Sequence, residues 1–170
     1  GDSLIQRNVD RLRMVQEAML KQGKLLLPVI APGKASYYPE YIPKRYAQKF
    51  GPTNYDSYRR HMENTSLIYI DFRKWFLANK SKSPYPLYPL SGIHWSNYGA
   101  VLSFDSIMKV TSHALQVNTP RIAISSIKWE EQLQYPDNDI AEGLNLLYPL
   151  KNKALAYPNY LVFDADSANL

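Results

Sequence analysis

Hydrophobic positions in the first thirty residues predict a helix followed by a buried strand. Apolar side chains recur every three or four positions through residues 3–22, which is the spacing of one helical face. They are Ile5, Val9, Leu12, Val15 and Met19. We expect Asp2 or Ser3 to cap this helix and Gly23 to end it. The continuous apolar run of residues 25–30 predicts a strand buried on both faces, and its proline favours an edge position or a bulge.

Helix and strand patterns alternate along the rest of the chain. Helices are expected over 55–64, 72–79, 96–115 and 137–147, with Asn54 and Asp71 as caps of the first two. Strands are expected over 67–70, 121–127 and 160–163. This alternation is typical of a single α/β domain, residues 1–170, with a mostly parallel sheet. In such sheets, active residues gather in loops beyond the carboxyl ends of the strands.

Composition excludes several classes of protein. The chain of 170 residues has no cysteine, which rules out disulfides, thiol catalysis and thiolate metal sites. Its three histidines are far apart in sequence, so we expect no metal site and no cofactor. Lys and Arg are scattered and the net charge is only +5, which argues against a nucleic-acid partner. No apolar run approaches twenty residues, so no membrane span is expected.

A histidine placed between a proline-rich loop and a helix is the best candidate for chemistry. The block Ser91–Ala100 puts His94 at the mouth of the predicted helix, where an imidazole can take or give a proton near neutral pH. Asn97 either stabilises an oxyanion or points to solvent. Lys34, after a Pro-Gly turn, either binds an acidic sugar or acyl carbonyl or is a solvated turn residue.

Tyrosine and proline are abundant, with 14 Tyr and 12 Pro, and several stand side by side. Such rigid loops carry flat amphipathic rings, which suit the faces of sugars. They are equally suited to covering the edges of the core, and for most of these rings we favour that interpretation.

The first residues, Gly1-Asp2-Ser3-Leu4, spell the nucleophile motif of GDSL-type esterases. That motif needs an apolar strand before its serine, whereas here a helix follows and no strand precedes it. We therefore expect Ser3 to be part of a helix cap and not a nucleophile.

Residues Gly92–Ala100 resemble the His-Trp block of SGNH-hydrolase-like O-acetyltransferases, relatives of the alginate O-acetyltransferase proteins of bacterial cell envelopes. Residues 28–34, 38–43 and 68–72 resemble further pieces of that family in the same order. The resemblance implies a three-layer SGNH-like fold, an extracytoplasmic location, and a polysaccharide or acylated sugar as substrate. It also implies that His94 is the general base and that Trp95 walls the pocket.

Two departures from the family pattern shape the expectations. Gly92 stands where the family has an aspartate two residues before the histidine, so the imidazole is oriented by Asp71, Asp105 or Asp139, or works in a Ser–His dyad. The sequence does not distinguish among these.

The second departure is the missing nucleophile, because no strand ending in Gly-x-Ser follows residue 120. We read Asp164–Ser167 as linker, and expect a fold incomplete at its C-terminus, a serine outside this chain, and an inactive isolated chain. The alternative is a non-catalytic glycan-binding or structural envelope module.

Overall fold

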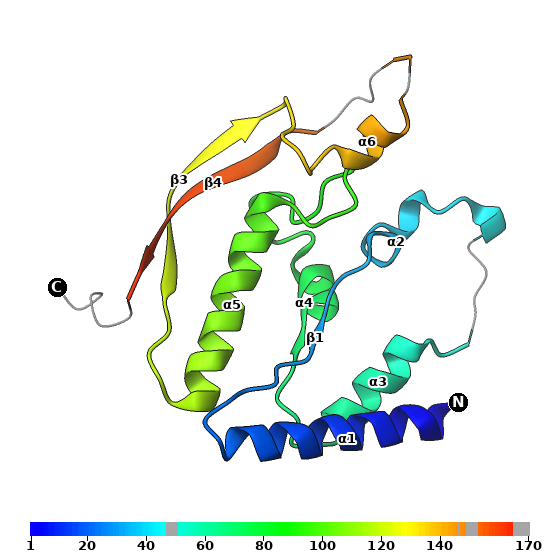
Figure 1. Cartoon of the computed structure of the whole chain (residues 1–170). Helices are drawn as coiled ribbons and strands as arrows, with labels where there is room; N and C mark the ends of the chain where they lie inside the picture. The colour runs from blue at the N-terminus through cyan, green and yellow to red at the C-terminus, as the bar shows by residue number, and fades with distance from the viewer. Residues whose placement is uncertain (47–50, 146, 149–152, 165–170) are drawn as a thin grey trace.

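Helices and two small sheets make up the computed structural model, which describes residues 1–46, 51–145, 147–148 and 153–164 (Figure 1). The α-helices are α1 (Asp2–Leu20), α2 (Lys34–Tyr37), α3 (Asn54–Glu63), α4 (Phe72–Asn79), α5 (Asn97–Leu115) and α6 (Asp139–Gly143). Two 3₁₀ turns, η1 (Pro39–Tyr41) and η2 (Lys44–Tyr46), follow α2. The strands are β1 (Val29–Ile30), β2 (Ile70–Asp71), β3 (Arg121–Glu130) and β4 (Leu155–Phe163). None of the described helices is long and apolar enough to cross a membrane.

The predicted helices are present, although the last one, expected over 137–147, covers only Asp139–Gly143. Three of them, α3, α4 and α5, carry side-chain caps that fix their first turns. The Asp71 carboxylate accepts a hydrogen bond from the Lys74 amide at the start of α4, as expected. At α3 the prediction of Asn54 as cap is wrong by one residue. Thr53 is the cap, because it forms a reciprocal capping box with Asp56.

The start of α1 is also different from the expectation. Gly1 is the capping residue, and no side chain bonds the first turn. The Asp2 carboxylate instead receives Arg60 at 2.6 Å and His61 at 3.1 Å, both on α3. These contacts help to hold α1 against α3 at one end of the molecule (Figure 1).

The first sheet is much shorter than the two apolar runs predict. Only two residues of each run pair, in parallel, with Val29 opposite Ile70. Next to this pair, the buried Gln16 side chain of α1 bonds both segments in place of strand pairing. Its amide group donates to Leu26 O (2.7 Å) and Ile68 O (2.8 Å), and its oxygen accepts the Ile68 backbone amide (2.9 Å). Pro28 has no amide hydrogen to offer. The Gln16 side chain therefore bridges two segments for which the sequence pattern predicts longer strands.

The second sheet corrects the prediction of a mostly parallel arrangement. Strands β3 and β4 pair antiparallel from Arg121–Phe163 to Glu130–Leu155, with a bulge between Ile124 and Ser126. They form the longer of the two sheets in the described part of the chain. Figure 1 shows this ribbon running along α5, which it contacts. The fold is α/β in content, but its longer sheet is antiparallel.

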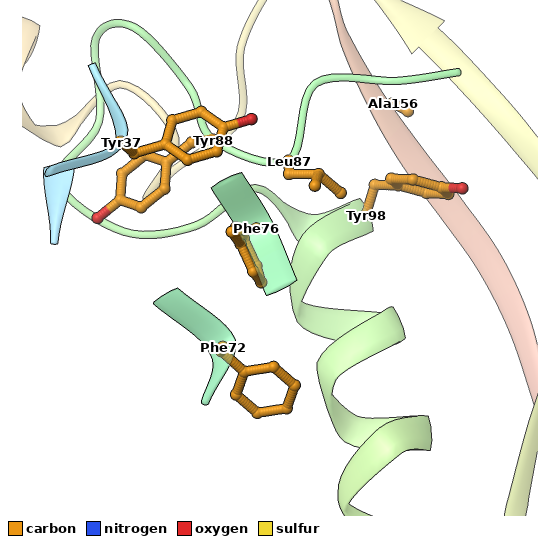
Figure 2. Close-up of a cluster of buried hydrophobic side chains, with 7 residues drawn as sticks. All are labelled: Tyr37, Phe72, Phe76, Leu87, Tyr88, Tyr98 and Ala156. Carbon is orange, nitrogen blue, oxygen red and sulfur yellow. The ribbon is translucent and has the colours of Figure 1, made fainter. Parts of the chain in front are cut away.

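Aromatic rings dominate the core between α2, α4 and α5 (Figure 2). Its buried members are Tyr37, Phe72, Phe76, Leu87, Tyr88, Tyr98 and Ala156. Tyr37 stacks on Tyr88 with ring centroids 5.4 Å apart. Rings from the Tyr-Pro loop are thus buried in the core, which agrees with the interpretation that such rings cover apolar surface.

Candidate functional site

His94 lies two residues before Ser96, the cap of α5, and its side chain is 58% exposed. The Ser96 hydroxyl accepts the Gly99 amide and donates to Pro86 O, so the chain entering the helix is fixed. The imidazole Nε2 lies 3.5 Å from Asp139 Oδ2 on α6. An exposed imidazole therefore stands beside a carboxylate at the N-terminal end of α5.

Of the three carboxylates that the sequence offered as partners of His94, Asp139 is the one that reaches it. Its other oxygen, Oδ1, accepts the Ile93 amide at 2.8 Å, so the carboxylate is held between the histidine and the backbone just before it. Asp71 instead caps α4 and accepts the Tyr55 hydroxyl at 2.8 Å. Asp105 pairs with Lys109 at 2.6 Å and with Arg121 at 3.2 Å.

Lys34 holds the loop that leads to His94. Its ammonium donates to three backbone carbonyl oxygens, Pro89 O at 2.8 Å, Leu90 O at 2.7 Å and Gly92 O at 2.6 Å. Burial lowers the pKa of this ammonium, and the nearby Asp139 carboxylate opposes that shift. All three protons of the ammonium are thus used inside the protein.

Gly92 occupies a place where no side chain fits. A Cβ atom there would stand 2.5 Å from the carbonyl oxygen of Asp137. Next to it, Ser91 O accepts the amides of Ile140 and Ala141, both at 3.1 Å. The backbone ahead of α6 thus lies directly on the loop that presents His94.

Asp137 is a buried residue of this region that sequence reasoning missed. The residue is 1% exposed, and Oδ2 accepts a hydrogen bond from the Asn97 side-chain amide at 3.2 Å. Burial raises the pKa of the Asp137 carboxyl, and hydrogen bonds from Asn97 and Tyr157 oppose that rise. Asn97 therefore bonds Asp137. The available sequence signal was the Asp137-Asn-Asp139 cluster after a proline, which also fits an ordinary turn.

Trp95 packs into the aromatic core. Its ring centroid lies 5.5 Å from that of Phe72 and 5.3 Å from that of Phe76, both on α4. Because Trp95 directly follows His94 in sequence, its packing helps to fix the backbone position of the histidine. Trp95 is not among the residues that line the apolar cavity described next.

An apolar cavity of about 930 Å³ opens next to the histidine and its carboxylate. Its lining includes Ile93, which precedes His94, and Ile140, which follows Asp139. The remaining lining residues are Lys34, Ala35, Tyr38, Tyr41, Ile42, Leu90, Ser91 and Leu144. A cavity of this size accommodates a small organic group. At the edge of this cavity, the His94 imidazole can accept a proton, and the neighbouring Asp139 carboxylate can stabilise the resulting positive charge.

Neither serine of the loop serves as a nucleophile in this geometry. Ser91 is 3% exposed and its hydroxyl donates to Asp137 O at 3.4 Å, while Ser96 is fully buried. Ser3 belongs to α1, which packs on α3 far from α6 (Figure 1). Ser167 lies outside the described residues. Among the residues that the structure describes, no group of three or more His, Asp or Glu is arranged to hold a metal ion.

Comparisons with known proteins agree with this fold. The family model of the SGNH hydrolase-like domain of the acetyltransferase AlgX matches residues 1–147. Among solved structures, the O-acetyltransferase domain of Pseudomonas putida AlgJ matches with a TM-score of 0.56 and 16% identity, over 96% of this chain and 58% of that chain. At that identity the likeness concerns the fold, and the chain spans little more than half of that structure's length. No curated protein matches the chain significantly.

Proposed function

The chain belongs to the SGNH hydrolase-like domain family of the acetyltransferase AlgX, and from this premise we propose that it takes part in O-acyl transfer to a polysaccharide outside the cytoplasm. Acetyl is the group that the family description names, and the matching AlgJ structure is likewise an O-acetyltransferase domain. The single observation that supports a catalytic role in this chain is the exposed imidazole of His94, paired with Asp139 at the edge of an apolar cavity.

In this proposal His94 is the general base. A serine hydroxyl gives its proton to the imidazole nitrogen that does not face Asp139, while its oxygen attacks the acyl carbonyl of the donor. The proton then passes to the leaving oxygen of the donor. In the second half, the acceptor sugar's hydroxyl gives its proton to His94, its oxygen attacks the acyl-serine, and the serine recovers a proton.

Asp139 stabilises the imidazolium that forms in each half of the reaction. Its carboxylate is anchored by the Ile93 amide, so it approaches the ring from a fixed direction. We propose that the serine comes from outside the described residues. In support, Ser91 and Ser96, the serines nearest to His94 in sequence, are buried and their hydroxyls donate to backbone carbonyls.

The test is a His94→Ala substitution in the producing cell, followed by measurement of ester-linked acetyl groups on its extracytoplasmic polysaccharides. We expect a loss of about 100-fold or more in the acetylation rate, since general base catalysis contributes about 10²–10⁴-fold. His113→Ala is the matched control, because His113 is an exposed histidine in the last turn of α5. Unchanged acetylation in His94→Ala cells that contain normal amounts of the protein would favour the non-catalytic glycan-binding alternative.

A further inference from the structure

We infer that residues 137–141 form a clip that positions His94, with Asp137 as its buried anchor and Asp139 as its contact to the imidazole. The inference rests on the proposed function only for the chemical role of His94. The clip itself is a claim about which contacts hold the loop, and it is tested without activity.

The backbone half of the clip is a close contact between two segments far apart in sequence. Ser91 O accepts two amides, from Ile140 and Ala141, so the first turn of α6 is bonded to the loop. At Gly92 the Asp137 carbonyl occupies the space that a Cβ would need, at 2.5 Å. A carboxylate carried by residue 92 is therefore incompatible with the clip. The carboxylate beside His94 comes instead from Asp139, 46 residues after Ile93.

The side-chain half of the clip is Asp137. Its carboxyl is buried and bonds Asn97 in the first turn of α5, and it interacts with Tyr157 on β4. These contacts tie the clip to the helix that follows His94 and to the long sheet. Asp137 is not in contact with the imidazole, so it is a positioning residue that acts through Asp139.

Amide hydrogen exchange of the folded protein measures the clip directly. The reporters are the amides of Ile93, Ile140 and Ala141, whose bonds join the two segments. In Asp137→Ala we expect all three to exchange at least about tenfold faster, which corresponds to about 1.4 kcal/mol. Asp137→Asn keeps an acceptor oxygen and should restore most of the protection. Asp105→Ala removes a carboxylate farther along α5 that pairs with Lys109 on α5 and Arg121 on β3, and it should leave the exchange of the three amides unchanged.

A second variant keeps the clip testable if Asp137→Ala fails to fold. Gly92→Ala adds only one methyl group, against the Asp137 carbonyl, and should speed exchange at Ile140 and Ala141 while amides of α3 keep their protection. Unchanged exchange at the reporters in every one of these variants that folds, including Gly92→Ala alone, would overturn the clip.

A functional readout then separates the clip from the proposed function. Asp139→Asn and Asp137→Ala should lower polysaccharide acetylation at least about tenfold, whereas Asp137→Asn should retain most of it. If His94→Ala leaves acetylation unchanged, the proposed function fails, and the exchange pattern still decides the clip. If His94→Ala abolishes acetylation but Asp137→Ala has no effect on the reporters or on acetylation, the clip fails alone.

Discussion

Gly99 of α5 lies against the backbone of Leu87, so closely that a Cβ on Gly99 would stand 2.6 Å from the Leu87 carbonyl oxygen. The same Cβ would be 3.2 Å from two atoms of the Phe76 ring. The absence of a side chain at Gly99 thus lets the helix, the loop before His94 and the aromatic core approach one another.

Gly99→Ala should therefore destabilise the fold. Overpacking of a rigid site costs about 1–3 kcal/mol, whereas the better helix propensity of alanine returns at most about 1 kcal/mol. We expect a net loss in the free energy of unfolding, measured by urea denaturation. Gly143→Ala is the matched control in α6, because a Cβ there would meet nothing within 4 Å. A Gly99→Ala protein as stable as the Gly143→Ala protein would contradict the close contact.

Lys34 should contribute far more to stability than an ordinary surface lysine. Lys34→Met removes three hydrogen bonds from an ammonium to the carbonyls of the His94 loop. Bonds to charged groups are worth about 1.5–3 kcal/mol each and are not additive, so we expect a total loss of about 2–4 kcal/mol in the free energy of unfolding. Lys109→Met removes the ion pair between an exposed ammonium and Asp105, which keeps Arg121 as its second partner, and it should cost less than about 1 kcal/mol. Equal losses in the two variants would show that Lys34 is not a structural residue of the loop.

Local sequence patterns predicted the helices well, because helical periodicity and caps are encoded by residues three or four apart. Asp71 could be recognised as a cap from its position before Phe72, and the structure confirms it. The sheets were predicted poorly because pairing is decided by distant residues. Gln16 replaces strand pairing between Leu26 and Ile68, and nothing in a polar position on a helix indicates that.

The candidate site likewise has features that neighbouring residues predict and features that depend on contacts between distant segments. His94 could be found from its own neighbours in sequence. Its partner could not be chosen, because Asp139 reaches it only through the contact of α6 with the loop. Asp137 was missed for the same reason, since its burial follows from the packing of α5 and β4 around it. Lys34 was considered as a ligand for substrate, and its three carbonyl partners come from a loop 55–58 residues away.

The isolated chain should not turn over a small acetyl ester such as p-nitrophenyl acetate by a serine mechanism. Ser3 belongs to α1, and the serines next to His94 are buried. We expect no release of p-nitrophenol in a burst that scales with protein concentration, and no difference between the native chain and Ser3→Ala. Such a burst, if abolished by Ser3→Ala or by Ser167→Ala, would place the nucleophile inside this chain and contradict the proposal.

The buried carboxyl of Asp137 should leave a signature in the pH dependence of stability. Burial raises its pKa, so the folded protein binds a proton more tightly at this site than the unfolded chain does. For such a group, the free energy of unfolding falls as pH rises from the unfolded pKa, about 3.9, to the raised folded pKa, and then stays level. Carboxylates with lowered pKa values, such as Asp105, contribute the opposite slope, so the Asp137 effect must be isolated by difference.

Asp137→Asn provides that difference, because the amide keeps an acceptor for Asn97 and does not ionise. We expect the stability of the variant relative to the native protein to increase as the pH rises from about 3.9, the unfolded pKa, through the raised folded pKa of Asp137, and then to stay level, since only the native protein bears the cost of a buried charge. Urea denaturation at intervals of half a pH unit measures both proteins. Asp105→Asn should give the reverse trend, with relative stability falling as pH rises, because it removes a carboxylate whose ionised form is stabilised by Lys109 and Arg121. If the stability difference between Asp137→Asn and the native protein does not change with pH, then solvent reaches the Asp137 carboxyl and this residue is not a buried anchor.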